Sequence, residues 1–220
     1  MRGVPHGMKS KMGVIQFGGI ACILSGILFL AQQLFLLPVP HPPAPDGELL
    51  AWLAEWKLQL SMADELLVFA ALLLIPAVVA IYRVLAKTDL IKALLGCGLL
   101  ALNIPVYMIL VVVLGRLVYP VYDIELSPES YRLVLSLYYG GLHLAFLIFG
   151  LAIILLSFAI RKSPIGKPAA YLGFLTGVLA FAGAYPWLMG NGAVLAIQLV
   201  FTAWLILVGI RLLDRKVGNV

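Results

Sequence analysis

Residues 133–160 decide the fold: they read LVLSLYYGGLHLAFLIFGLAIILLSFAI and contain no Asp, Glu, Lys or Arg. A helix needs about 20 mostly apolar residues to cross the hydrocarbon layer of a bilayer, which is roughly 30 Å thick. The run is long and continuously apolar, without the alternation of apolar and polar residues that marks a membrane β-strand. It therefore predicts a transmembrane α-helix.

Five further stretches of the chain have the same character. The 220 residues are 63% hydrophobic and only 11% charged, whereas a soluble domain is about 25% charged. This composition excludes an ordinary soluble enzyme and a nucleic-acid-binding module, because the folded surface must itself be apolar. We predict an all-α, polytopic membrane protein, a single domain over residues 1–220 whose surroundings are the lipid bilayer. The six predicted spans cover about 13–37, 61–82, 90–119, 133–160, 169–189 and 193–213.

The basic residues predict how the spans are oriented. All but three of the 15 Lys and Arg residues lie in the two tails, in the connections after the second and fourth spans, or in the ends of the spans that border them. The three exceptions are Lys57, Arg116 and Arg132. Because cytoplasmic loops collect Lys and Arg, we predict a protein of a prokaryotic cell membrane with its N- and C-termini in the cytoplasm.

The first outer connection contains five prolines in residues 38–45, which predict an extended segment. Asp46 then begins a stretch in which apolar residues, two of them Trp, recur at helical spacing up to Leu60. This pattern predicts a short interfacial helix on the outer surface, followed by a bend into the second span. In the last outer connection, Asn191 and Gly192 predict a tight turn.

Polar residues inside the spans are the first candidates for a site, because burying them in lipid is costly. Counted from the flanking charges, Asn103 and His143 both fall near the midplane, and Tyr139 shares a helix face with His143. With Gln198 of the last span they predict a polar interior. The alternative is that each makes an isolated hydrogen bond between helices, worth about 1 kcal/mol.

A second polar group lies toward the outer side. Asp64 or Glu65 pairs with Arg116 at the mouth of a cavity in one interpretation; in the other, they are a solvated helix start and an arginine at a helix end. The two cysteines, Cys22 and Cys97, lie in apolar runs without neighbouring metal ligands. The sequence has no HExxH and no nucleophile elbow. We therefore predict ligand-binding residues only, with no catalytic residue, metal or cofactor.

Parts of the chain resemble a family of uncharacterised six-span prokaryotic membrane proteins, known as a domain of unknown function. The resemblance implies the six-helix architecture and singles out His143, and it brings no activity, substrate or cofactor. The segments that carry it are Gly140-Gly141-Leu142-His143 through Gly150, Arg161-Lys162-Ser163, Leu172-Gly173 with Gly177, and Leu66-Leu67-Val68 to Ile81-Tyr82-Arg83.

These observations predict a non-enzymatic membrane protein that binds a small or lipid-like ligand, or a helix of a partner membrane protein, in an outward-facing polar cavity. Two alternatives stay open. A small-solute transporter would use a discontinuous helix at Pro76 or Pro105. An intramembrane enzyme would use His143.

Overall fold

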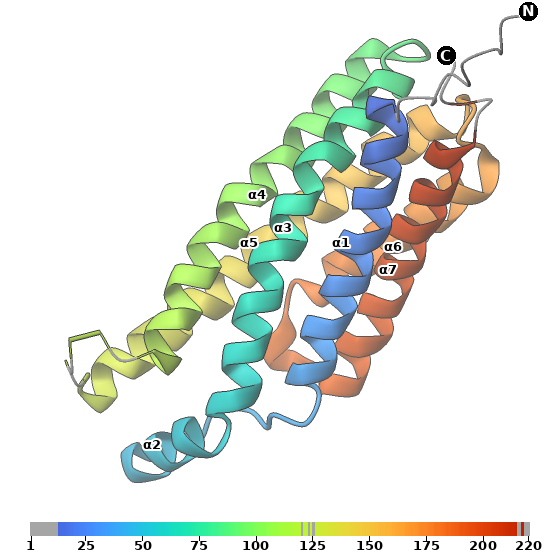
Figure 1. Ribbon diagram of the computed structural model, residues 1–220. Helices are drawn as coiled ribbons and strands as arrows, with labels where there is room; N and C mark the ends of the chain where they lie inside the picture. Colours follow the sequence, from blue (N-terminus) through green and yellow to red (C-terminus); the bar gives the residue numbers. More distant parts are fainter. Residues whose placement is uncertain (1–12, 120, 123, 125, 215–216, 218–220) are drawn as a thin grey trace, which may run out of the picture.

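A computed structural model describes residues 13–119, 121–122, 124, 126–214 and 217, and within these ranges it contains helices and no strand (Figure 1). The basic tail residues Arg2, Lys9, Lys11, Arg215 and Lys216, which entered the orientation prediction, lie outside the described residues. The elements are α1 (Val14–Leu36), α2 (Asp46–Glu55), α3 (Lys57–Leu85), α4 (Leu90–Val118), α5 (Pro128–Ile160), α6 (Lys167–Gly183), the short 3-10 helix η1 (Pro186–Leu188) and α7 (Asn191–Leu213).

Five of the described helices, α1, α3, α4, α5 and α7, are long and apolar enough to cross a membrane. This confirms an all-helical chain of membrane character. The expected span over residues 169–189 is shorter as a helix, because α6 ends at Gly183 after 17 residues. Pro186 disfavours helical geometry at the preceding residue, and Tyr185 accordingly has φ −118° and ψ 61°. The rest of that stretch forms η1 and its flanking turns.

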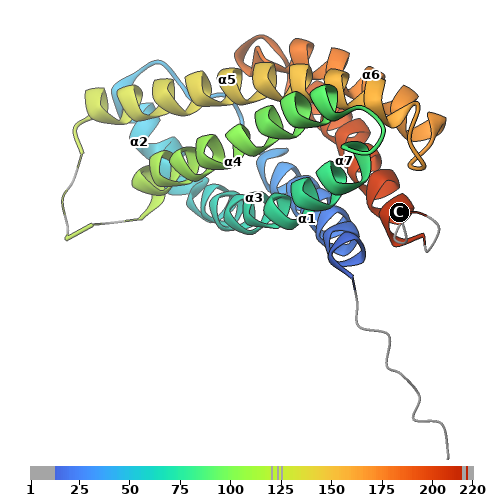
Figure 2. The ribbon, with the colours of Figure 1, turned by 90° about the horizontal axis from the view of Figure 1, so that it is seen from above.

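The six long helices form a ring in chain order, α1–α3–α4–α5–α6–α7, which closes where α7 packs against α1. Figure 1 shows that α1 begins and α7 ends at one end of the bundle, here called the terminal end, whereas α2 lies at the opposite end, here called the α2 end. Figure 2 shows the same helices from above, with α4 and α5 beside each other and α7 next to α1. Sequential antiparallel neighbours are expected where connections are short.

The helices approach each other most closely through glycines in the half of the bundle near the terminal end. A Cβ at Gly18 of α1 would lie 2.2 Å from the Cβ of Ala80 and 2.5 Å from the carbonyl oxygen of Pro76, both in α3. A Cβ at Gly209 of α7 would lie 2.6 Å from the carbonyl oxygen of Gly19. Small residues that allow close backbone approach are the usual contact sites of membrane helices. This half of the ring is therefore tightly packed.

The short helix and the bend predicted after the proline-rich segment are confirmed as α2 and a non-helical Trp56, with φ −97° and ψ 11°. α3 begins at Lys57, earlier than the predicted start at residue 61, so the charged residue is part of the helix. α5 also begins early, at Pro128 instead of residue 133. Ser127 caps it, because its hydroxyl accepts a hydrogen bond from the Ser130 backbone N–H at 3.3 Å.

Candidate functional site

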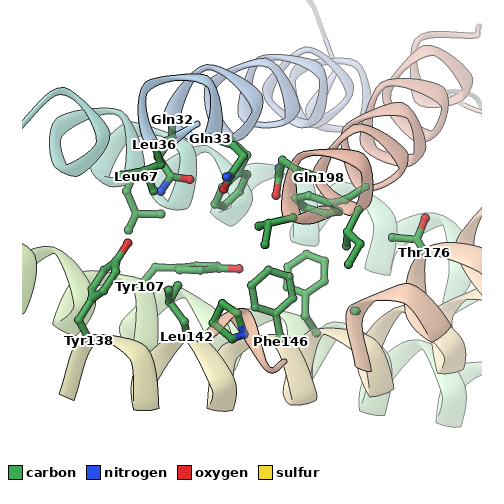
Figure 3. A pocket seen from close by; sticks show the side chains of 17 residues that line it. Gln32, Gln33, Leu36, Leu67, Tyr107, Tyr138, Leu142, Phe146, Thr176 and Gln198 are labelled. Atoms are coloured by element: carbon green, nitrogen blue, oxygen red, sulfur yellow. The ribbon is translucent and has the colours of Figure 1, made fainter. Parts of the chain in front are cut away.

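A cavity of about 70 Å³ lies between the helices in the half of the ring near the α2 end (Figure 3). We call it the inner compartment. A water molecule needs about 10–15 Å³ of such space, so the inner compartment has room for roughly five waters or for one small ring. Every long helix contributes to its wall. The lining residues are Phe29, Gln32, Gln33, Leu36, Leu67, Tyr107, Tyr138, Leu142, Phe146, Phe149, Thr176, Ala180, Pro186, Val194, Ile197, Gln198 and Phe201.

A second cavity of about 80 Å³ adjoins the first on the side of the α2 end. We call it the mouth compartment. The two cavities share the side chains of Gln33, Tyr138 and Leu142, among others. Beyond these, the mouth compartment is lined by His41 of the proline-rich segment and by Trp52 of α2. The inner compartment therefore leads toward the α2 end.

Hydrogen bonds hold the proline-rich segment over the mouth compartment. The Nδ2 of Asn191, the first residue of α7, donates to the carbonyl oxygens of Leu37 at 3.0 Å and Val39 at 2.6 Å. The indole Nε1 of Trp52 donates to the carbonyl oxygen of Pro40 at 3.1 Å. The segment is thus tied to α7 on one side and to α2 on the other. Asn191 was expected in a tight turn, but it begins a helix.

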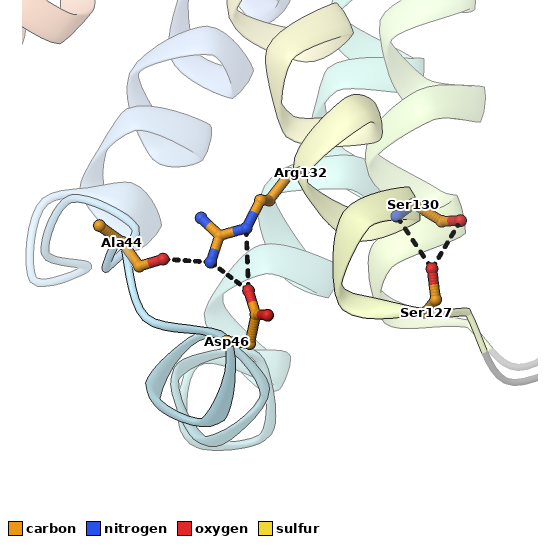
Figure 4. A network of polar contacts seen from close by, with 5 residues as sticks. All are labelled: Ala44, Asp46, Ser127, Ser130 and Arg132. Atoms are coloured by element: carbon orange, nitrogen blue, oxygen red, sulfur yellow. Dashed lines mark hydrogen bonds and ion pairs between the residues drawn. The ribbon is translucent and has the colours of Figure 1, made fainter.

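A third contact joins α2 to α5 (Figure 4). The guanidinium of Arg132 forms an ion pair with Asp46, with Nε 3.1 Å from Oδ1, and also donates to the carbonyl oxygen of Ala44. Both charged side chains are exposed. Because exposed ion pairs contribute little free energy, this contact orients α2 more than it stabilises the bundle.

Aromatic rings form one continuous wall of the inner compartment. The ring centroids of Phe29 and Tyr107 are 5.2 Å apart, those of Phe29 and Phe201 are 5.5 Å apart, and those of Phe149 and Phe201 are 4.6 Å apart. The rings are tilted or edge-on, which is the favoured geometry for aromatic pairs. The wall joins α1, α4, α5 and α7 and presents apolar surface to the cavity.

The polar groups on the cavity wall are amides and hydroxyls. Figure 3 shows Gln32, Gln33 and Gln198 on one side of the space and Tyr107 and Tyr138 on the other. Two of these groups, the hydroxyl of Tyr138 and the Nε2 of Gln198, are buried and have no hydrogen-bond partner among the described residues. A buried donor without a partner costs about 1–3 kcal/mol. A molecule in the cavity that accepts these hydrogen bonds removes this cost, and its binding is favoured by a similar free energy.

Two of the residues expected in a polar interior line the cavity: Gln198 the inner compartment and Tyr139 the mouth compartment. Asn103 does not. It is completely buried, and its Nδ2 donates to the carbonyl oxygen of Ala145 at 3.2 Å, so it joins α4 to α5. No described residue donates a hydrogen bond to its Oδ1.

His143 is likewise not among the residues that line either compartment. Its Nδ1 lies 2.6 Å from the carbonyl oxygen of Ala184 and donates to it, which joins α5 to the end of α6. The imidazole centroid lies 5.0 Å from the ring of Tyr185 and 5.7 Å from that of Trp187. Asn103 and His143 thus make separate contacts between helices. Across the described part of the chain, no group of three or more His, Cys, Asp or Glu residues is placed to hold a metal ion.

The three charged residues expected at the rim do not pair with one another. Arg116 donates to the carbonyl oxygens of Tyr119 at 3.4 Å and Ile124 at 3.2 Å. Glu65 accepts a hydrogen bond of 2.9 Å from the hydroxyl of Tyr119. Asp64 is buried, and its Oδ1 has no hydrogen-bond partner in the described part of the chain. None of the three charged side chains lines the inner or the mouth compartment.

The sequence interpretation did not assemble the glutamines, tyrosines and phenylalanines into one site, although a signal was present. The lining positions recur every three or four residues within 29–36 of α1, 138–149 of α5 and 194–201 of α7. Such spacing places residues on one helix face. The segments of α1 and α7 lie in the half of their helix that is nearer the α2 end, and the segment of α5 spans the middle of its helix.

No protein-family model, curated protein or solved structure matches this chain. Its resemblance to a family of six-span membrane proteins stays a prediction, and the case for a function rests on the cavity.

Proposed function

We propose that this chain is a six-span protein of a prokaryotic cell membrane that binds a small, lipid-soluble ligand inside its helix ring. The observation that carries the proposal is the inner compartment, whose wall includes side chains from all six long helices. Ligand sites are characteristically concave, mostly apolar and furnished with a few polar groups. The inner compartment has this composition, and the mouth compartment offers the way in from the α2 end.

α6 supports the sixth crossing. It occupies a place in the ring between α5 and α7, and its 17 residues lie at the lower end of the range for a transmembrane helix. Its large exposed side chains recur every three or four residues, as expected for a stripe that faces lipid. They are Tyr171, Leu175, Val178 and Phe181. With six crossings, α1 begins on the side of the membrane where α7 ends, and the basic residues favour the cytoplasm for that side.

Cysteine labelling tests the sixth crossing directly. The native Cys22 and Cys97 are buried, so they give little background. Leu188→Cys lies beyond the end of α6, and Lys162→Cys lies before its start; both positions are exposed. A membrane-impermeant maleimide applied to intact cells is expected to label Leu188→Cys, and to label Lys162→Cys only after the membrane is permeabilised. Labelling of both from the same side contradicts the crossing.

Filling the cavity tests the ligand. Ala180 of α6 is buried and lines the inner compartment, so Ala180→Phe is expected to occupy its space. Ala182→Phe on the same helix is the matched control, because that position is exposed. Native mass spectrometry of protein purified from cells and transferred into nanodiscs of one synthetic lipid measures what each variant retains. The wild type and Ala182→Phe are expected to retain a small molecule that Ala180→Phe lacks. The same set of masses in all three proteins, or none, contradicts the proposal.

A further inference from the structure

The inner compartment carries no charge on its described lining. Its polar side chains are three glutamines, two tyrosines and one threonine, and the remainder are apolar. Moving an ionised group from water into such surroundings is very costly unless an opposite charge pairs with it. An anion or a cation finds no such partner on this wall. The chemistry of the lining therefore selects an uncharged ligand.

The polar groups without a partner indicate which hydrogen-bonding group the ligand carries. The amide Nε2 of Gln198 only donates, so its missing partner is an acceptor. Tyr138 lies where the two compartments meet, because it lines both, and its hydroxyl is also unpartnered. The hydroxyl of Thr176, in contrast, already donates to the carbonyl oxygen of Leu172 at 2.8 Å. Gln198 is therefore the group best placed to select an oxygen acceptor.

The volume of the inner compartment and the aromatic rings in its wall indicate the size of the ligand and the shape of its apolar part. Room for about five waters, at about 30 Å³ of liquid each, corresponds to roughly eight to ten non-hydrogen atoms. The tilted rings of Phe29, Phe149 and Phe201 present edges and faces against which a flat ring packs favourably.

We infer that the ligand is a neutral, ring-containing carbonyl compound whose oxygen accepts a hydrogen bond from the Gln198 amide. The part of the ligand that extends toward the mouth compartment passes the hydroxyl of Tyr138. This inference rests on the proposed function, because it names the ligand class of the same cavity.

Three probes of nearly equal size test it: acetophenone has a ring and a carbonyl, ethylbenzene has the ring alone, and benzoate carries a charge. Binding to the full chain in detergent is measured by saturation-transfer NMR, with empty micelles subtracted. Acetophenone is expected to bind the wild type. Gln198→Met, which keeps the length of the side chain, is expected to weaken acetophenone binding about three- to tenfold and to leave ethylbenzene binding within about twofold. Benzoate is expected not to bind.

Tyr138→Phe is the second variant, since it removes only the hydroxyl, and a smaller loss for acetophenone alone is expected. Retained ethylbenzene binding shows in each case that the variant is folded. Equal effects of Gln198→Met on the two neutral probes, or binding of benzoate as tight as that of acetophenone, overturn the ligand class and leave the proposed function standing. If none of the probes binds and Ala180→Phe behaves like the wild type, the proposed function fails as well.

Discussion

The side-chain nitrogen of Asn191 lies 2.6 Å from the carbonyl oxygen of Val39 and 3.0 Å from that of Leu37. The first residue of α7 thus satisfies carbonyl groups where the chain leaves α1. Carbonyls at the end of a helix have no partner within that helix, and prolines in the following segment have no backbone N–H to offer. A side chain from another helix takes over this role and fixes the segment above the mouth compartment.

Asn191→Ala is therefore expected to lower the free energy of unfolding by about 1–3 kcal/mol, since it leaves these carbonyl groups without their donor. Hydrogen–deuterium exchange in α2 is expected to become faster, because the cover over the mouth compartment is loosened. Unfolding in bicelles and exchange mass spectrometry measure the two effects. Gly192→Ala is the matched control, as nothing lies within 4 Å of a Cβ at that position. Equal effects of the two variants contradict the role of Asn191.

Arg132→Gln removes the ion pair with Asp46. Because both side chains are exposed, the expected loss of stability is below about 1 kcal/mol, and it shrinks further in high salt. The exchange rate of α2 is still expected to rise, since Arg132 also holds the carbonyl oxygen of Ala44. The free energy of unfolding of the wild type and of Arg132→Gln, measured at low and at high salt concentration, gives the loss of stability and its salt dependence. A loss above 2 kcal/mol (roughly twice the usual maximum for such pairs) is incompatible with this interpretation.

Gly18→Ala is expected to push α1 away from α3, because the added methyl group meets the Cβ of Ala80 and the backbone of Pro76. Overpacking of this kind costs about 1–3 kcal/mol. Gly98→Ala is the control within α4, where a Cβ meets nothing within 4 Å; it is expected to be neutral or to stabilise by up to about 1 kcal/mol. Steric-trapping measurements in bicelles give both values. Similar losses of stability in the two variants show that the close approach of α1 and α3 at Gly18 does not cause the loss.

The connection between α3 and α4 is expected to depend on pH through Asp89. Its pKa lies below the ordinary value, because its carboxylate accepts hydrogen bonds from the side chain and then from the backbone N–H of Lys92. A lowered pKa in the folded state means that this contribution is complete above the unfolded-state pKa of about 3.9 and is lost as the pH falls through the folded-state value. Protection of the Lys92 amide is expected to be constant at neutral pH and to fall in this acidic window.

Asp89→Asn removes the negative charge and keeps the helix cap, since asparagine is also a good helix N-cap. The protection of the Lys92 amide, measured by NMR down to pH 3, is expected to show no acidic decrease in this variant. A wild-type profile that matches the variant throughout assigns the pH effect to another group.

The positions of the long helices were predictable because they depend on hydropathy along the chain, but the ends of the helices depend on local chemistry. The predicted fifth span ran through Pro186, where the structure ends α6 at Gly183 and forms η1. The predicted fourth span started at the first apolar residue after Arg132, whereas the cap at Ser127 starts α5 earlier.

The candidate site was less predictable for a physical reason. Depth within the membrane follows from counting residues, and this placed Asn103 and His143 near the midplane. Which face of a helix points inward depends on its rotation, and lipid-facing and inward-facing positions are equally apolar in a membrane helix. Leu142 lines the cavity while Leu144, two residues later, is exposed. The sequence does not distinguish them.

The contact between α1 and α7 has a consequence for biosynthesis. The thiol of Cys22 donates to the carbonyl oxygen of Leu205, 183 residues later. The helix ring is therefore complete only after the last helix, α7, has been synthesised. At 5–20 residues per second, the ribosome needs about 10–40 s to make that interval. During this time the nascent chain has no enclosed cavity, so the ligand of the proposed function is expected to bind only after α7 has been translated.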